Sequence, residues 1–281
     1  MAKSVKISGI TKLAILFLLI TLPTILAAQG NLLVTPRRVV FDGSSRVVDV
    51  NLANTGADTA RYSISFIQYR MNEDGSFQEI TEPDPGQYFA DRYLRFFPRS
   101  VTLAPNEAQV IKIQVTNTNR LEPGEYRSHA YFRALPKVVA LGEENQQTDT
   151  TQLSIQLTPI FGISIPVIVR VGTSNTTVAI EKAELKVDQD GNRFISFKFN
   201  REGNMSVYGD LIITHIAIDG TEKQIAAVNG IAVYTPGNVR NMNIPLPPDT
   251  KSELGSGKLR ITYSGQSQTR PQKYAEAEIN L

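Results

Sequence analysis

The chain has 281 residues, with 29 Lys and Arg against 27 Asp and Glu, and it contains no Cys. The lack of Cys excludes thiol nucleophiles, Cys-ligated zinc, disulfide crosslinks and a lipid anchor attached to a cysteine. A chain of this length can bury one or two hydrophobic cores without crosslinks, which small exported domains need most.

The first 28 residues have the pattern of a secretory signal peptide. Lys3, Lys6 and Lys12 precede the apolar run Leu13–Leu26, and Ala28 ends a small-residue exit. The run is shorter than the about 20 residues that a membrane helix needs, so we expect cleavage after Ala28 and a soluble mature chain rather than an uncleaved anchor. Cleavage removes three Lys and leaves 26 basic residues against 27 acidic ones, which gives no support for a nucleic-acid or anionic-membrane partner.

Beyond this leader, the chain has the pattern of short β-strands separated by polar turns. Leu33–Phe41 is extended, and Pro36 marks either a sheet edge or a break, because proline cannot donate a ladder hydrogen bond. Alternating apolar and polar residues at this spacing predict an antiparallel β-sandwich. The further strands predicted in the first half are Val48–Leu52, Tyr62–Phe66, Tyr93–Phe97, Ile111–Val115 and Glu125–Ala134.

Tyr126 follows the turn Pro123-Gly124 at the start of a late strand. This spacing is typical of a tyrosine corner, in which the hydroxyl binds the backbone a few residues upstream in immunoglobulin-like sandwiches. The motif predicts that Tyr126 fixes the beginning of its strand.

The segment Thr151–Arg170 closes the first predicted domain. Its first half alternates strictly and puts Leu153, Ile155 and Leu157 on one face. From Ile160 to Val169 the apolar residues are nearly continuous, which predicts burial on both faces. The apolar row of the first half can belong to the core of its own domain, or it can be an edge that is offered to another chain.

Residues 172–281 repeat the β pattern and predict a second, smaller sandwich, so the fold class is all-β with two domains in tandem, 29–171 and 172–281. Ala179–Val187 and Arg193–Phe199 predict a hairpin through the turn Asp188–Gly191. The remaining predicted strands are Val207–Ile218, Gly230–Tyr234, Val239–Leu246, Lys258–Tyr263 and Tyr274–Ile279.

The sequence offers no credible active site. His129 and His215 are isolated in strands, and neither has a second His or a carboxylate at ligand spacing. Asp188–Asn192 resembles the start of a calcium loop, but Arg193 and Phe199 stand where that loop needs Gly and Glu. Turn chemistry explains these acids better, and we expect no enzyme, no metal and no cofactor.

Several motifs together resemble the first domain of the periplasmic pilus-assembly chaperones of the chaperone–usher pathway. They are Arg38–Gly43, Asp74-Gly75, Pro123–Arg127, Phe132–Pro136 and the alternating strand from Leu153, and the resemblance covers most of residues 30–170. It implies two immunoglobulin-like β-sandwiches in the periplasm. It also implies that the chain lends a strand to a pilus subunit and delivers it to an outer-membrane usher.

The resemblance implies that Leu153, Ile155 and Leu157 are the donor residues that fill the groove of the subunit. It further implies that Arg38 holds the C-terminal carboxylate of the subunit, a task that suits a guanidinium because it binds a carboxylate with two parallel hydrogen bonds. The family has a second anchor, a lysine on the donor strand. No lysine lies between Leu157 and Arg170 here, so either Arg37 or another arginine replaces it, or the anchoring differs.

By the same resemblance, Glu125 and Arg170 contribute to an interdomain salt-bridge network, whose partner in the second domain the sequence does not identify. Without the resemblance, Arg38 can be a solvated strand arginine. The alternative function is an exported cell-surface adhesive or structural β-sandwich module, which would leave the periplasm and bind a surface without any subunit.

Overall fold

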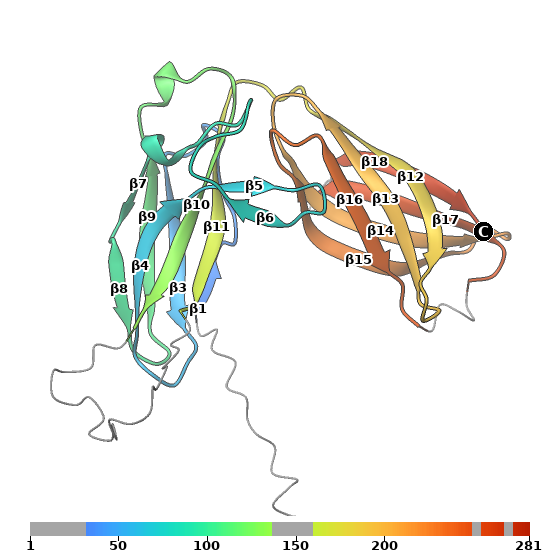
Figure 1. Cartoon of the computed structure of the whole chain (residues 1–281), viewed down its shortest axis with the longest axis horizontal. Coiled ribbons are helices and arrows are strands. Elements are labelled where there is room, and N and C mark those ends of the chain that lie inside the picture. Colours follow the sequence, from blue (N-terminus) through green and yellow to red (C-terminus); the bar gives the residue numbers. More distant parts are fainter. Residues whose placement is uncertain (1–31, 137–159, 249–253, 267–271) are drawn as a thin grey trace, which may run out of the picture. The chain divides into compact units, whose positions relative to one another are not determined.

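A computed structural model describes residues 32–136, 160–248, 254–266 and 272–281, which form two β-sandwiches (Figure 1). The chain is therefore all-β, as the strand pattern predicts. One sheet of the first sandwich contains, in spatial order, β1 (Leu32–Thr35), β3 (Val47–Asn54), β9 (Ala108–Val115) and β7 (Leu94–Phe97). The facing sheet contains β2 (Val39–Phe41), β11 (Gly162–Val171), β10 (Gly124–Leu135), β4 (Ala60–Ile67) and β8 (Ser100–Leu103).

The remaining elements of the first half are small. A hairpin of β5 (Tyr69–Met71) and β6 (Phe77–Glu79) follows β4, and two single turns of 3-10 helix are η1 (Asp91–Tyr93) and η2 (Thr118–Arg120). Met71 is 8% exposed and belongs to the core of the second sandwich rather than the first. The hairpin therefore contributes a buried side chain to the second core.

The second sandwich has a sheet of three strands facing a sheet of four. Its first two strands form the hairpin that the sequence predicts, and Asp188 Oδ1 accepts hydrogen bonds from the backbone N–H groups of Asp190 and Asn192 in the turn. The three-stranded sheet contains β12 (Thr177–Val187), β13 (Arg193–Glu202) and β16 (Val239–Pro245). The four-stranded sheet contains β15 (Glu222–Val233), β14 (Val207–Ala217), β17 (Gly257–Gly265) and β18 (Lys273–Asn280).

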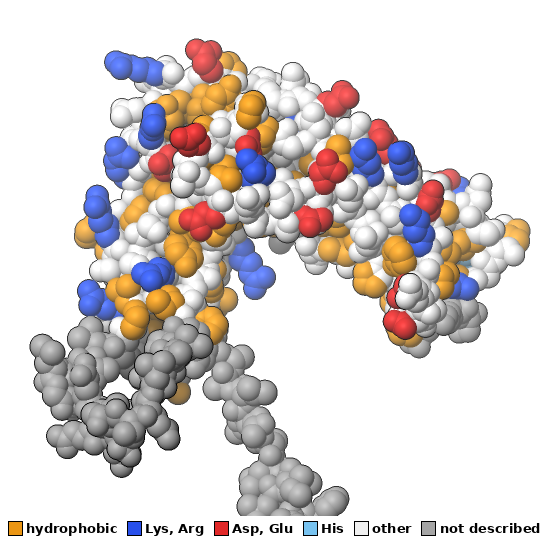
Figure 2. Space-filling model, in the orientation of Figure 1, with side chains coloured by type: hydrophobic (Ala, Val, Ile, Leu, Met, Phe, Trp, Pro, Cys, Tyr) orange, Lys and Arg blue, Asp and Glu red, His pale blue; other side chains and the backbone are white. Residues whose placement is uncertain are grey.

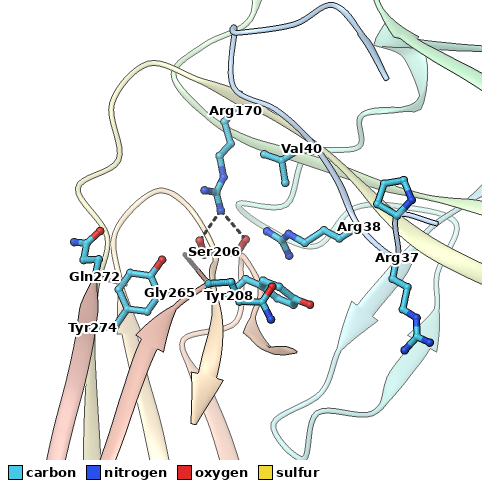
Figure 3. A pocket seen from close by; sticks show the side chains of 11 residues that line it. Arg37, Arg38, Val40, Arg170, Ser206, Tyr208, Gly265, Gln272 and Tyr274 are labelled. Atoms are coloured by element: carbon cyan, nitrogen blue, oxygen red, sulfur yellow. Dashed lines mark hydrogen bonds between the residues drawn. The ribbon is translucent and has the colours of Figure 1, made fainter. Parts of the chain in front are cut away.

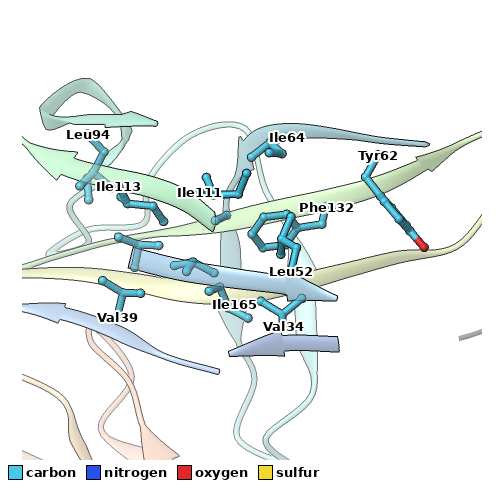
Figure 4. Packing of buried hydrophobic residues seen from close by; sticks show 14 of the residues in the cluster. Val34, Val39, Leu52, Tyr62, Ile64, Leu94, Ile111, Ile113, Phe132 and Ile165 are labelled. Carbon is cyan, nitrogen blue, oxygen red and sulfur yellow. The ribbon is translucent and has the colours of Figure 1, made fainter. Parts of the chain in front are cut away.

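The core of the first sandwich lies between its two sheets, where the alternate side chains of facing strands meet. Figure 4 shows Leu52 of β3 and Ile111 of β9 packed toward Phe132 of β10, and all three are completely buried. Tyr126 lies at the edge of this core, and its hydroxyl donates to the carbonyl of Glu122 at 3.2 Å. The predicted tyrosine corner is therefore confirmed.

Pro36 marks a change of sheet. β1 ends at Thr35 in one sheet of the first sandwich, and β2 begins at Val39 in the other. Within β2, Val39 and Phe41 face the first core, while Val40 packs against the second. The break predicted at Pro36 is confirmed, and it leaves Arg38 at the point where the chain joins the second sheet.

β11 begins at Gly162, and Leu153, Ile155 and Leu157 lie outside the described residues. The prediction of burial on both faces from Ile160 onward is wrong for the first two residues, because Ile160 is 44% and Phe161 46% exposed. Both residues precede β11, beside the last residues of β10, where the Ala134 N–H donates to the Phe161 carbonyl. Ile165, Val167, Ile168 and Val169 are buried.

Side chains of both charge signs are scattered over the face that Figure 2 shows, in agreement with the near balance of charge in the sequence. Within the part of the chain that the structure describes, no helix is long and apolar enough to cross a membrane.

Candidate functional site

A cavity of about 710 Å³ is lined by residues of both sandwiches. Figure 3 shows that Arg38 and Arg170 extend from the first sandwich toward Ser206 and Tyr208 of the second. Hydrogen-bonding and charged groups dominate this lining, so the cavity is suited to a polar or anionic ligand. The lining residues are Pro36, Arg37, Arg38, Val40, Arg170, Ser206, Tyr208, Gly265, Gln266, Gln272 and Tyr274.

Arg38 is held by aromatic residues of the second sandwich. Its Nη1 donates to the hydroxyl of Tyr234 at 3.1 Å, and its guanidinium carbon lies 4.5 Å from the ring centroid of Tyr208. Among the described residues, no carboxylate lies within salt-bridge distance of Arg38. A half-buried guanidinium that is positioned by neutral groups keeps its charge available for an anionic ligand.

The two other predicted arginines behave differently. Figure 3 shows the Arg37 side chain pointing away from Arg38, and Arg37 is exposed. Arg170, on β11, directs its guanidinium into the cavity that Arg38 lines. The structure thus brings all three arginines to the lining of one cavity, but the Arg37 side chain points away from Arg38.

Glu125 and Arg170 are paired across β10 and β11, which places their side chains on the same face. Arg170 Nη2 lies 3.0 Å from Glu125 Oε2, and the Glu125 side chain is completely buried. The same carboxylate oxygen accepts from the Ser206 hydroxyl at 2.7 Å and from its backbone N–H at 3.0 Å. Arg170 in turn donates to the Ser206 carbonyl at 2.7 Å. Ser206 is therefore the contact in the second sandwich that the sequence did not identify.

Arg127 contacts the same Tyr234 ring as Arg38 and was not singled out from the sequence. It is 3% exposed, stacks 4.1 Å from the centroid of Tyr234, and donates to the carbonyls of Tyr69 and Thr235. Burial lowers the pKa of Arg127, because the charged form loses its hydration. The motif Pro123–Arg127 contains this residue, but a strand arginine gives no sign in the sequence that its partners are carbonyls.

His129 lies on the same face of β10, two residues further along. It is 4% exposed, its ring meets those of Tyr69 and Phe77, and its Nδ1 has no hydrogen-bond partner among the described residues. Burial, reinforced by the charges of Arg127 and Arg38, lowers the pKa of His129 to about 3. The ring is therefore neutral at pH 7.

Arg201 of β13 supports the second-sandwich wall of the cavity. It is 2% exposed, and its guanidinium donates to the carbonyls of Gly203 and Met205 on one loop and to Gly237 on another. The first loop leads to Ser206, and the second follows Tyr234. Arg201 thus fixes two loops that contact the first sandwich.

The edge of β11 near this cavity is partly open. Residues Gly162–Val171 pair with β10 on one side, whereas β2 pairs on the other side only with Val167–Val169. Within the described chain, the second edge of Gly162–Pro166 has no partner strand. An unpaired edge of this kind is a template for a further strand.

His129 and His215 are both buried and lie in different sandwiches. Among the described residues, no group of three or more His, Asp or Glu side chains could hold a metal ion. The arginines of the first cavity are suited to an anion, and the open edge of β11 is suited to an extended chain.

Neither a family model nor a curated protein matches this chain. It is similar to the solved structure of the Pseudomonas aeruginosa chaperone CupB2, at 11% identity and a TM-score of 0.42, over 89% of this chain and 100% of that one. It is also similar to the class 5 fimbriae chaperone CfaA, at 15% identity and a TM-score of 0.39, over 89% and 98% of the two chains. A third similar structure is the Salmonella enterica SafA pilin in complex with the SafB chaperone, at 13% identity and a TM-score of 0.39, over 89% and 96%. All three descriptions name chaperones.

Proposed function

We propose that this chain is a periplasmic chaperone that binds pilus or fimbrial subunits by donor-strand complementation and delivers them to an outer-membrane usher. The first domain ends with β11 at Val171, and residues 172–281 form the second. The observation that carries the proposal is the parallel pairing of β2 with β11, which puts Arg38 at the end of the open edge.

Strand direction relates this open edge to Arg38. β2 runs parallel to β11 and begins beside Val167, directly after Arg38. A guest strand that occupies the same edge beside Gly162–Pro166 therefore meets Arg38 at one of its two ends. A guest that runs parallel to β11 brings its C-terminal end to Arg38, with the terminal carboxylate. An antiparallel guest brings its N-terminal end, with the terminal ammonium. A guanidinium attracts the first and repels the second, so the charge selects the parallel guest.

Arg38 is the primary anchor, because it faces the cavity without a carboxylate partner among the described residues. Arg170 supplies a second positive charge on β11, where the resembled family has its lysine, but Arg170 also binds Glu125 and Ser206. We therefore propose that Arg170 belongs to the interdomain network and also makes the electrostatic potential in the cavity more positive. Arg37, whose side chain points away in Figure 3, is the weaker candidate for a second anchor.

Leu153, Ile155 and Leu157 precede β11 in the sequence and lie outside the described residues. They have the same parity as Ile163 and Ile165, which face the first core. In the proposal they fill the core of the subunit instead. Each buried aliphatic side chain would contribute about 1.5–3 kcal/mol from desolvation, and the entropy of association offsets part of that sum.

The test is co-expression in a bacterial periplasm with small β-rich exported proteins encoded beside this chain. We expect a 1:1 complex that protects one of them from proteolysis. Arg38→Ala should weaken the complex at least about thirtyfold, since truncating one partner of a buried charge pair costs about 2–5 kcal/mol. Arg120→Ala is the matched control, because Arg120 is exposed on η2 and lines neither the cavity nor the open edge.

Two results would contradict the proposal. One is full yield of the neighbouring proteins in the absence of this chain. The other is recovery of the chain outside the periplasm, bound to a surface without a subunit, which is what an adhesive or structural module would do.

A further inference from the structure

The turn of the β5–β6 hairpin contacts an edge strand of the second sandwich. β16 lies at one edge of the three-stranded sheet, and within the described residues only β13 pairs with it. The Asn241 N–H of β16 donates to the Glu73 carbonyl in the hairpin turn at 2.6 Å. The side-chain amide of Asn241 also donates to the Glu73 carboxylate, at 3.3 Å. One residue of the turn thus binds both the backbone and the side chain of this strand.

These hydrogen bonds lie on the side of β16 that faces away from β13. The Asn238 carbonyl and the Leu246 N–H, just outside the two ends of β16, both bond to β13. Hydrogen bonding alternates along an antiparallel strand, so the residues of even number face β13 and those of odd number face the free edge. The N–H groups at the free edge belong to Val239, Asn241 and Asn243. Pro245, the next residue in this series, has no N–H and ends it.

The other edge strands of the second sandwich have different protection against pairing with a foreign strand. The pairings of β12 and β15 contain register shifts, and β18 exposes Lys273, Glu276 and Glu278. Such irregularities and charges are the usual means by which a sheet edge resists pairing. β16 pairs with β13 in an unbroken register, and its exposed side chains are uncharged. Its free edge is therefore protected by Pro245 and by the hairpin turn.

Two contacts hold the hairpin in this position. Gly75 has φ of +84°, and a Cβ at this residue would lie 2.7 Å from Arg240 Nε. Arg240 is itself fixed, because its Nη1 donates to the Ala232 carbonyl. Met71 of β5 is the second contact, since it is 8% exposed in the core of the second sandwich. Only glycine allows the turn to lie this close to β16.

We infer that the hairpin turn caps the free edge of β16, and that displacing the turn lets this edge pair with the same edge of a second copy of the chain. The two strands run antiparallel about a twofold axis, with Asn241 opposite Asn241 of the second copy and Val239 opposite Asn243. No like charges face each other in this register, so nothing opposes the pairing. This self-pairing does not depend on the proposed function, because no residue of β16 lines the cavity of Arg38.

The experiment displaces the turn in the full chain, purified from a bacterial periplasm. Gly75→Ala introduces the Cβ that meets Arg240. Gly220→Ala is the matched control, because Gly220 has φ of +85° but no neighbouring atom of the described residues within 4 Å of a Cβ. Both changes strain a turn in the same way, and only the first pushes against β16. Met71→Asp is a second means of displacement, since it places a carboxylate in the second core.

Two measurements follow the edge and its partner. Hydrogen exchange of the Asn241 amide reports whether the turn still covers the edge, and analytical ultracentrifugation over a range of concentrations reports self-association. We expect Gly75→Ala and Met71→Asp to speed the exchange at least about tenfold and to form a dimer where the parent and Gly220→Ala stay monomeric. Adding Asn243→Pro, which removes an N–H from the free edge only, should restore the monomer.

Every other result contradicts the proposal. If neither displacing variant speeds the exchange of Asn241, the turn does not cap the edge. If exchange becomes faster but the chain stays monomeric, or carries a different polypeptide in place of a second copy, the edge does not pair with itself. A dimer that survives Asn243→Pro, or that Gly220→Ala also forms, uses another surface.

Discussion

Replacing Glu125 should weaken the contact between the two sandwiches, so that they no longer unfold together. Its carboxylate is completely buried and receives hydrogen bonds from Arg170 of the first sandwich and from Ser206 of the second. Glu125→Ala would leave the Arg170 guanidinium without its carboxylate and the Ser206 N–H without its acceptor. Both groups lie in places that water reaches only partly, so the loss is large.

The magnitude follows from this burial. Breaking a buried ion pair by removing one partner costs about 3–5 kcal/mol. Because the Arg170 side chain is 27% exposed and can regain some hydration, we expect the lower part of that range, about 3 kcal/mol. Glu125→Gln keeps the shape and loses the charge, and it should cost about 1.5–3 kcal/mol, the contribution of a hydrogen bond to a charged group.

The assay is chemical denaturation followed by circular dichroism and by the fluorescence of the tyrosines, since the chain has no Trp. Asp49→Asn is the matched control, because Asp49 and Lys112 form an exposed pair whose side chains are 53% and 63% accessible. Such pairs contribute about 0–1 kcal/mol. Glu125→Ala should also divide a single transition into two. If it destabilises the chain no more than Asp49→Asn does, the network does not couple the sandwiches.

Two further substitutions test the first sandwich. Tyr126→Phe should lower the free energy of unfolding by about 1 kcal/mol, the net value of one hydrogen bond, because it removes the donor to the Glu122 carbonyl; an unchanged denaturation midpoint would contradict the role of the corner. The pKa of His129 is lowered to about 3, so the imidazole takes up a proton at a higher pH in the unfolded chain than in the folded chain. Stability should therefore fall as the pH drops from about 6.5 toward 3, by up to about 1.4 kcal/mol per pH unit, and His129→Leu should flatten that part of the profile relative to the parent chain.

The sequence predicted those features of the fold that depend on interactions between residues close together in the chain. Pro36 breaks the first extended segment because it lacks an N–H, and the same residue explains why the chain changes sheets there. Tyr126 could be placed because its corner depends on residues four positions away. The predicted strand Gly230–Tyr234 was too short, because β15 begins at Glu222. Its first residues are mostly polar or small and show little alternation of apolar and polar side chains.

The contacts between the sandwiches could not be predicted, because they join residues that are distant in the sequence. Nothing around Ser206 distinguishes it from a turn serine, yet it accepts from Arg170 and donates to Glu125. Ile160 and Phe161 were expected to be buried from composition alone. Their exposure is a property of the assembled sheet, which the apolar pattern of one segment does not show.

The buried guanidinium of Arg201 limits how the second sandwich can be exchanged between related proteins. It donates to carbonyls of two separate loops, and lysine could not replace it, because one ammonium lacks the span of a planar fork. A chimera that combined this first sandwich with the second sandwich of another protein would need an arginine with equivalent hydrogen bonds at this position. Without it, the transplanted loops would not hold Ser206 and Tyr234 where the first sandwich requires them.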